Sequence, residues 1–243
     1  MKKDRFYIFV VLFLWSVLTC PAGFFFGQNQ TAAAAGGFTF INQLQYVPNG
    51  GSATSGTLDC TGADLILVWV GSFNAYPASA VVDSAGNNYT AGTLQTGTNA
   101  CAQVWYKKNP TGSLSALTFT ATIGTTSYAY YGIQAFSGGS TSTIDQQSGA
   151  NGSAASSYQP GSITPTQNNA LVTTAVFCYN QGGTPSISSP TMTSYGSGSV
   201  SGGVMGGNGW VVQGTAAAIN PTWTGTSFSG GGNFETAQAS FIP

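Results

Sequence analysis

The sequence predicts an all-β protein, a double-sheet antiparallel β-sandwich of the jelly-roll or immunoglobulin-like kind. Short runs rich in β-branched and aromatic residues recur along the chain, and clusters of Gly, Pro, Asn and Ser separate them. No stretch carries the period of an amphipathic helix. Aromatic residues form 13 % of the 243 residues, which argues against disorder, and this length is enough to bury a core.

The first 22 residues have the order of a signal peptide. The extreme N-terminus holds three of the five basic residues, an apolar stretch covers 6–18, and the tail T-C-P-A ends at Ala22. We expect cleavage after Ala22 or within 32–35. This order predicts that the rest of the chain is exported, to the cell surface or the extracellular space.

Two alternatives to cleavage stay open. Residues 6–26 would span about 30 Å as a helix, enough for a signal anchor. The sequence V-L-T-C, which ends at Cys20, resembles a bacterial lipobox, so Cys20 is a candidate for lipidation. If the segment is uncleaved or lipidated, we expect membrane contact only through it. Residues 23–37 are expected to be a linker to one domain at 38–243.

Three later segments carry the clearest strand and turn signals. The run 65–70 (L-I-L-V-W-V) is apolar on both faces, which predicts a central strand. Between Val81 and Tyr89, the residues D-S-A-G-N-N predict a tight hairpin. In 117–123 (L-T-F-T-A-T-I), apolar residues alternate with threonines, which predicts one buried and one solvated face.

A faint internal repeat extends over most of the domain, with a spacing of about 105 residues. We infer two related β-units, about 43–139 and 158–243, joined by a polar stretch. Neither unit is expected to bury a complete core alone, so we expect them to close as one sandwich; independent domains are the alternative. The matched positions include Leu58 with Ile163, Leu65 with Leu171, Val70 with Val176, Phe119 with Trp223, and Ala135 with Ala239.

Three short motifs lie in the middle of the chain. They are D-S-A-G-N-N-Y-T from Asp83, A-F-S-G from Ala135, and Q-P-G-S-I-T-P-T-Q-N-N-A-L-V at 159–172. Together they resemble a recurrent, poorly characterised group of secreted bacterial β-sandwich proteins. The resemblance covers roughly residues 65–180 and implies the fold and the export. It implies no activity and no catalytic residues, because the group has no settled activity.

Three cysteines follow the N-terminal segment. Cys60 precedes one expected strand and Cys101 begins another, so these two are the candidate disulfide pair. Such a bond would close a loop of about 40 residues, worth roughly 4 kcal/mol in the chain-entropy model. Cys178 lies in an apolar run and is expected to be a buried small hydrophobic residue.

Charged residues are scarce, at 5 % against about 25 % in a typical soluble domain. After the N-terminal segment, the only cations in the sequence are Lys107 and Lys108. Two cations cannot neutralise a phosphate backbone, which excludes nucleic acid as a partner.

The chain contains no histidine, which removes Ser-His-Asp and Cys-His catalysis and the commonest transition-metal ligand. A glycosidase needs two carboxylates beside a sugar, but nothing in the sequence brings two together. We assign no catalytic residue, cofactor or metal. The acidic residues after the N-terminal segment are Asp59, Asp64, Asp83, Asp145 and Glu235.

Four aromatic residues are candidates for contact with a ligand. Trp105 shares a strand face with Gln103 and Lys107, which indicates solvent exposure. Tyr128 and Tyr130 alternate with an apolar set, and Trp210 follows a glycine-rich run that suggests a loop rim. Flat aromatic faces and neutral hydrogen-bonding groups suit sugar binding. Packing against a second sheet is the commoner role of such residues, and the sequence favours it over ligand contact for all four.

Three functions therefore stay open for the exported domain. The favoured one is a non-catalytic binding module, with a polysaccharide or another surface component as partner, acting in glycan binding or adhesion. A structural, self-assembling component of a surface or matrix is the alternative. A carboxylate-based glycoside hydrolase is the third.

Overall fold

The computed structural model describes residues 37–243, except positions 49–51, 75, 125–127, 140, 154–155, 180–182, 201–203 and 226–231. Gly36–Pro243 form one compact unit, distinct from Met1–Ala35. The predicted signal peptide, its anchor and lipidation alternatives, and nearly all of the predicted linker lie outside the described residues. Among the described residues, no helix is long and apolar enough to cross a membrane.

The first half of the chain forms one large and one small antiparallel sheet. The large sheet has the strand order β1-β9-β3-β7-β5, and β6 also pairs with β7. The small sheet has the order β2-β8-β4. The strands are β1 (Thr39–Tyr46), β2 (Ala53–Thr54), β3 (Leu65–Phe73), β4 (Ala78–Asp83), β5 (Thr90–Ala91), β6 (Gln95–Thr96), β7 (Ala100–Lys108), β8 (Phe119–Ile123) and β9 (Ala129–Ser137).

The second half follows the same plan. Its large sheet has the order β10-β17-β12-β15-β14, and its small sheet has the order β11-β16-β13. The strands are β10 (Ile144–Ser153), β11 (Ser157–Tyr158), β12 (Ala170–Tyr179), β13 (Ser186–Ser189), β14 (Thr193–Val200), β15 (Val204–Gln213), β16 (Thr222–Thr224) and β17 (Asn233–Phe241).

Equivalent positions in the two halves hold similar structural features. The central strands β3 and β12 contain the matched residues Leu65 and Leu171 near their starts. An isolated bridge between Leu58 and Leu117 in the first half has a counterpart between Ile163 and Ile219 in the second.

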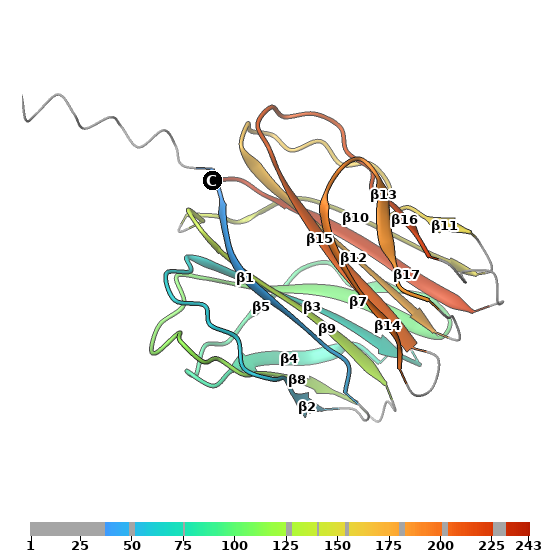
Figure 1. The fold of residues 1–243 in the computed structure, drawn as a ribbon, viewed down its shortest axis with the longest axis horizontal. Coiled ribbons are helices and arrows are strands. Elements are labelled where there is room, and N and C mark those ends of the chain that lie inside the picture. The colour runs from blue at the N-terminus through green and yellow to red at the C-terminus, as the bar shows by residue number, and fades with distance from the viewer. Residues whose placement is uncertain are drawn as a thin grey trace, which may run out of the picture. The chain divides into compact units, whose positions relative to one another are not determined.

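The four sheets are stacked in layers, with the two large sheets packed face to face. Figure 1 shows β2, β4 and β8 at one side of the molecule and β11, β13 and β16 at the other. Each small sheet covers the outer face of the large sheet of its own half. The predicted all-β sandwich is confirmed, and the small sheets add a second buried face to each large sheet.

The strongest sequence signals are confirmed. β3 is the central strand of its sheet and is buried on both faces. The hairpin forms, since the backbone amide of Tyr89 donates to the carbonyl of Val81 at 3.0 Å. Strand β8 alternates as expected, with Phe119, Ala121 and Ile123 buried and the threonines between them accessible.

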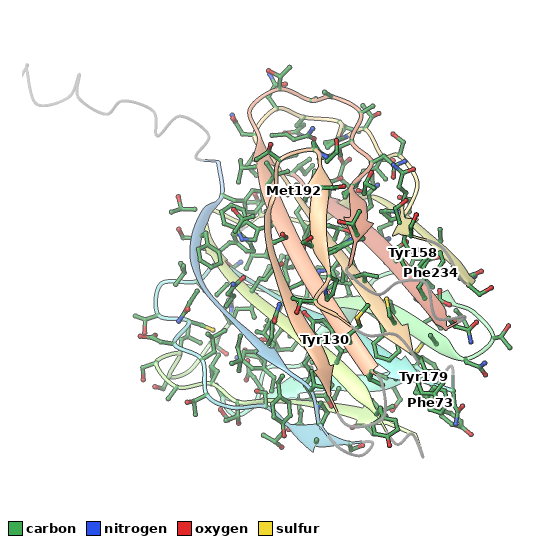
Figure 2. All side chains as sticks on the ribbon, turned by 45° about the vertical axis from the view of Figure 1, so that its right-hand side comes forward. Phe73, Tyr130, Tyr158, Tyr179, Met192 and Phe234 are labelled. Atoms are coloured by element: carbon green, nitrogen blue, oxygen red, sulfur yellow. The ribbon has the colours of Figure 1, made fainter. Side chains whose placement is uncertain are left out.

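The two large sheets approach closely because glycines face aromatic rings across the interface. A Cβ atom added to Gly71 would lie 2.5 Å from Cδ2 of Phe177. On the opposite sheet, a Cβ added to Gly206 would overlap the ring of Tyr130. In Figure 2, Tyr130 lies in the interior. The distance between the sheets therefore depends on residues without side chains at these points.

We predict that Gly71→Ala destabilises the domain by about 1–3 kcal/mol, because the added methyl group must displace the Phe177 ring in a packed core. Urea denaturation measures this loss. Gly214→Ala is the matched control, since no atom lies within 4 Å of a Cβ at that position. Equal stabilities of the two variants would contradict the close approach described here.

Candidate functional site

Trp105 is buried, with 6 % of its surface accessible, so its expected exposure is wrong. It belongs to the apolar cluster between the first large sheet and its small sheet, together with Val68 and Phe119. The alternation along β7 is confirmed, because Val104 faces the second large sheet, on the side of the strand opposite to Trp105. The error arises because the small sheet covers the face that was expected to meet solvent.

Tyr130 is also buried, at 1 % accessible surface, so its expected outward position is wrong. The second large sheet covers its face. Its hydroxyl donates to Oδ1 of Asn208 on β15 at 2.6 Å, and Nε2 of Gln45 reaches the same oxygen at 3.1 Å. Tyr130 therefore fixes one large sheet against the other.

Tyr128 and Trp210 are half-buried and take part in the packing of the sheets. Trp210 lies inside strand β15, which corrects the expected loop position, and stacks on Phe40 with ring centroids 4.9 Å apart. Tyr128 lies 6.5 Å from the ring of Phe73, which in turn stacks on Tyr179 (Figure 2). The four candidates therefore form no shared aromatic platform.

The expected disulfide is absent from the described residues, where Cys60, Cys101 and Cys178 are free and buried. Cys101 pairs with Ser72 near the end of β3, whereas Cys60 lies in the turn before the start of β3. The intervening strand separates the two sulfur atoms by about 20 Å at 3.3 Å per residue. Burial raises the pKa of Cys60 to about 12.

The four aspartates of the domain accept hydrogen bonds from protein groups, either within a turn or from a distant segment. Asp83 accepts hydrogen bonds from two backbone amides of the hairpin, from Nδ2 of Asn87 and from the hydroxyl of Tyr89. Asp59 accepts from the amide of Thr61, and Asp64 from that of Gly138. Asp145 accepts from both the amide and the hydroxyl of Thr166.

Glu235 differs from these aspartates in its hydrogen bonding. It lies in β17 at 1 % accessible surface, and its Oε2 atom has no hydrogen-bond partner among the described residues. Along β17 it shares a period-two face with Ala237, Ala239 and Phe241, so it points between the two large sheets. Gly97 makes room for it, because a Cβ there would overlap Oε1 of Glu235.

A cleft of about 140 Å³ opens in front of Glu235. Strand pairing places Asn151 opposite Glu235, and Nδ2 of Asn151 donates to the carbonyl of Thr96 at 3.1 Å. The walls are therefore built from the ends of β10 and β17 and the turn after β6. The residues that line the cleft are Gly97, Thr98, Asn151, Gly152, Ser153, Asn233 and Glu235.

The electrostatics of this cleft follow from burial. Loss of water raises the pKa of Glu235 from 4.5 to about 8, so the side chain is mostly protonated at neutral pH. A protonated carboxyl group offers one donor and retains acceptor capacity. With the amides and hydroxyls around it, the cleft can hydrogen-bond an uncharged polar group in either direction.

A second, larger cleft of about 340 Å³ lies where β7 ends. It contains both lysines of the domain. The residues that line it are Asn88, Thr90, Tyr106, Lys107, Lys108, Asn109 and Thr143.

No family model, curated protein or solved structure matches the chain.

The sequence contained a signal for Glu235 that alternation along the strand could have found. In N-F-E-T-A-Q-A-S-F at 233–241, the glutamate occupies the same face as Ala237, Ala239 and Phe241. A charged residue on a core face is unusual unless it is paired, and that anomaly marks a functional candidate. Neither cleft was predictable, because each joins segments distant in the sequence.

We predict that the stability of the domain falls as pH rises from 4.5 towards about 8, the window between the unfolded and folded pKa values of Glu235. In this window the folded state binds more protons than the unfolded state, so stability decreases with pH. Glu235 contributes less than about 1.4 kcal/mol per pH unit to the pH dependence of the free energy of unfolding. Urea denaturation of the wild type and of Glu235→Gln across this pH range measures the effect. The variant should lack the pH dependence that Glu235 contributes.

Asp145→Asn is the control with the opposite sign. Burial acts to raise the pKa of Asp145, but hydrogen bonds from Thr166 and Ser240 outweigh it and lower the pKa. Its stabilising contribution is therefore lost as pH falls, and removing it should leave the effect of Glu235 intact. Parallel pH profiles for wild type and Glu235→Gln would show that Glu235 titrates normally.

The three buried thiols should resist alkylation in the native protein and react only after unfolding. Iodoacetamide labelling followed by peptide mass spectrometry reports each cysteine separately. We expect Cys60, Cys101 and Cys178 all to be labelled in denaturant without reductant. Labelling of Cys178 alone would instead indicate a disulfide between the other two.

Proposed function

We propose that the chain is an exported, non-catalytic surface module that binds an uncharged, hydroxyl-bearing part of a glycan in front of Glu235. The observation that carries this proposal is the buried Oε2 atom, which has no protein partner among the described residues. An unpaired buried polar atom costs about 1–3 kcal/mol. A ligand hydroxyl that donates to Oε2 or accepts from the protonated carboxyl would recover that energy.

The composition of the cleft supports a neutral ligand over a metal ion. Calcium takes six to eight oxygen ligands and usually several carboxylates. Glu235 is the single carboxylate in the cleft, and its raised pKa reflects a site that disfavours charge. The rim residues Thr98, Asn151 and Ser153 are exposed and offer neutral donors and acceptors.

The size of the cleft limits what can enter it. Its volume of about 140 Å³ is below the 300–1,000 Å³ typical of pockets that enclose a whole small ligand. The cleft therefore suits a terminal group or the edge of one sugar unit, and the rest of the ligand would lie on the surface. This mode fits a module that attaches to a polymer.

A hydrolase is less well supported. The raised pKa of Glu235 would suit a general acid, but glycoside hydrolysis also needs a second carboxylate about 5–9.5 Å away. Asp145 lies six residues from the partner of Glu235 along β10, or about 20 Å. None of the four described aspartates lines the cleft.

Self-assembly is a second candidate, favoured by the edge strand β1. Its eight residues, T-F-I-N-Q-L-Q-Y, contain no charge and no proline. Natural edge strands usually carry such features to prevent pairing with another chain. A bulge between Phe40 and Asn42 interrupts the edge and reduces its value as a template.

We predict that Thr98→Trp reduces glycan binding by at least about tenfold, because the indole fills the cleft from its exposed rim without entering the core. A glycan array of neutral plant, fungal and bacterial polysaccharides identifies the ligand, and calorimetry measures the affinity. Ser113→Trp, at an exposed position outside the cleft, is the matched control. A blank array, or equal binding by both variants, would overturn the proposal.

A further inference from the structure

The lysine cleft concentrates the positive charge of the domain. Lys107 and Lys108 are the only lysine or arginine residues after the N-terminal segment, and both line the cleft of about 340 Å³. That volume lies within the range of ligand pockets.

The aspartates nearest in sequence to this cleft use their carboxylate oxygens on protein donors. Asp83 is bound within the hairpin, and Asp64 accepts from the backbone amide of Gly138 at 2.8 Å. Asp145 accepts from the hydroxyl of Thr166 at 2.7 Å. These carboxylates accept hydrogen bonds within the protein and none of them lines the cleft, so an anion supplied by a ligand can approach the lysines.

The other walls suit a sugar ring that carries this anion. Asn88 and Asn109 bring amides, Thr90 and Thr143 bring hydroxyls, and the Tyr106 ring offers an apolar surface. Tyr106 is held in place by an edge contact with Phe241, at 5.5 Å between ring centroids. Hydroxyl groups, an apolar ring face and one negative charge are the features of a uronic acid unit.

The net charge of the domain favours a ligand with few, widely spaced negative charges over a polyanion. Outside the N-terminal segment, the sequence has two lysines and four aspartates. The net charge is therefore negative, and the domain as a whole repels a polyanion with a charge on every unit. An isolated carboxylate needs only the local field of a lysine side chain at the cleft. This argues for a glycan in which carboxylates are spaced along a largely neutral chain.

The two clefts border the same strand. Thr143 lies just before the start of β10, and Gly152 and Ser153 lie at its end, so about 30 Å of strand separates them. Between them, the amide of Thr93 donates to Oε1 of Gln147, which ties β10 to the segment between β5 and β6. Leu94, one of the few exposed large apolar residues, follows directly. An extended glycan would have to span about 30 Å to contact both clefts.

We propose that the Lys107–Lys108 cleft binds the carboxylate of a uronic acid unit in the same glycan whose neutral part is recognised at Glu235. This inference rests on the proposed function and names its ligand class. Contact at two sites on one chain would raise the affinity above that of either site alone.

The test compares a uronic acid oligomer with its methyl ester by calorimetry on the purified protein. We expect the acid to bind about tenfold more tightly at low salt, and the difference to shrink at high salt. Lys107→Gln with Lys108→Gln should abolish the difference, whereas Lys107→Arg with Lys108→Arg should retain it. Thr143→Trp, which fills the cleft from an exposed position, should weaken binding of the acid.

The outcomes separate this inference from the proposed function. Equal binding of acid and ester, or no effect of the glutamine and Thr143→Trp variants, would overturn the lysine site while leaving the Glu235 cleft standing. Binding of the acid that responds to the lysine variants but not to Thr98→Trp would support the lysine site and overturn the role of Glu235.

Discussion

The two large sheets meet through a close contact of glycine backbone with aromatic rings, and the other layers depend on it. Phe177 packs on Gly71, and Tyr130 packs on Gly206. Buried polar side chains reinforce the contact, since Nε1 of Trp69 donates to Oγ1 of Thr173 at 2.9 Å. Both inner faces also contribute large apolar side chains, and their removal from water favours the association of the sheets. This interface therefore joins the two halves into one domain.

The same layering decides which residues are left for binding. Each large sheet is covered on both faces, so the aromatic residues suited to sugar contact are used for packing. Trp105 and Tyr130 are the clearest cases. Two clefts lie at the margin of the sandwich along β10, where strand ends and turns meet. Binding at such a margin requires hydrogen-bonding groups rather than a stacking platform.

Glu235 lowers the stability of the domain, and the fold does not require a carboxyl group at this position. An apolar residue at its position would continue the face formed by Ala237, Ala239 and Phe241. A desolvated carboxyl group without a protein partner lowers stability, and residues that do so are concentrated at functional sites. The two lysines line a cleft. The four aspartates instead accept hydrogen bonds within the protein.

The sequence by itself determined the β architecture, the central strand at 65–70, the hairpin after Val81 and the alternation in β8, because these depend on local patterns of two to eight residues. Only the tertiary structure decided that Trp105 and Tyr130 are buried, that Cys60 and Cys101 lie apart, and that Glu235 and the two lysines line clefts. The physical reason is that alternation tells which residues share a face of a strand, whereas the layer packed on that face comes from segments far away in the chain.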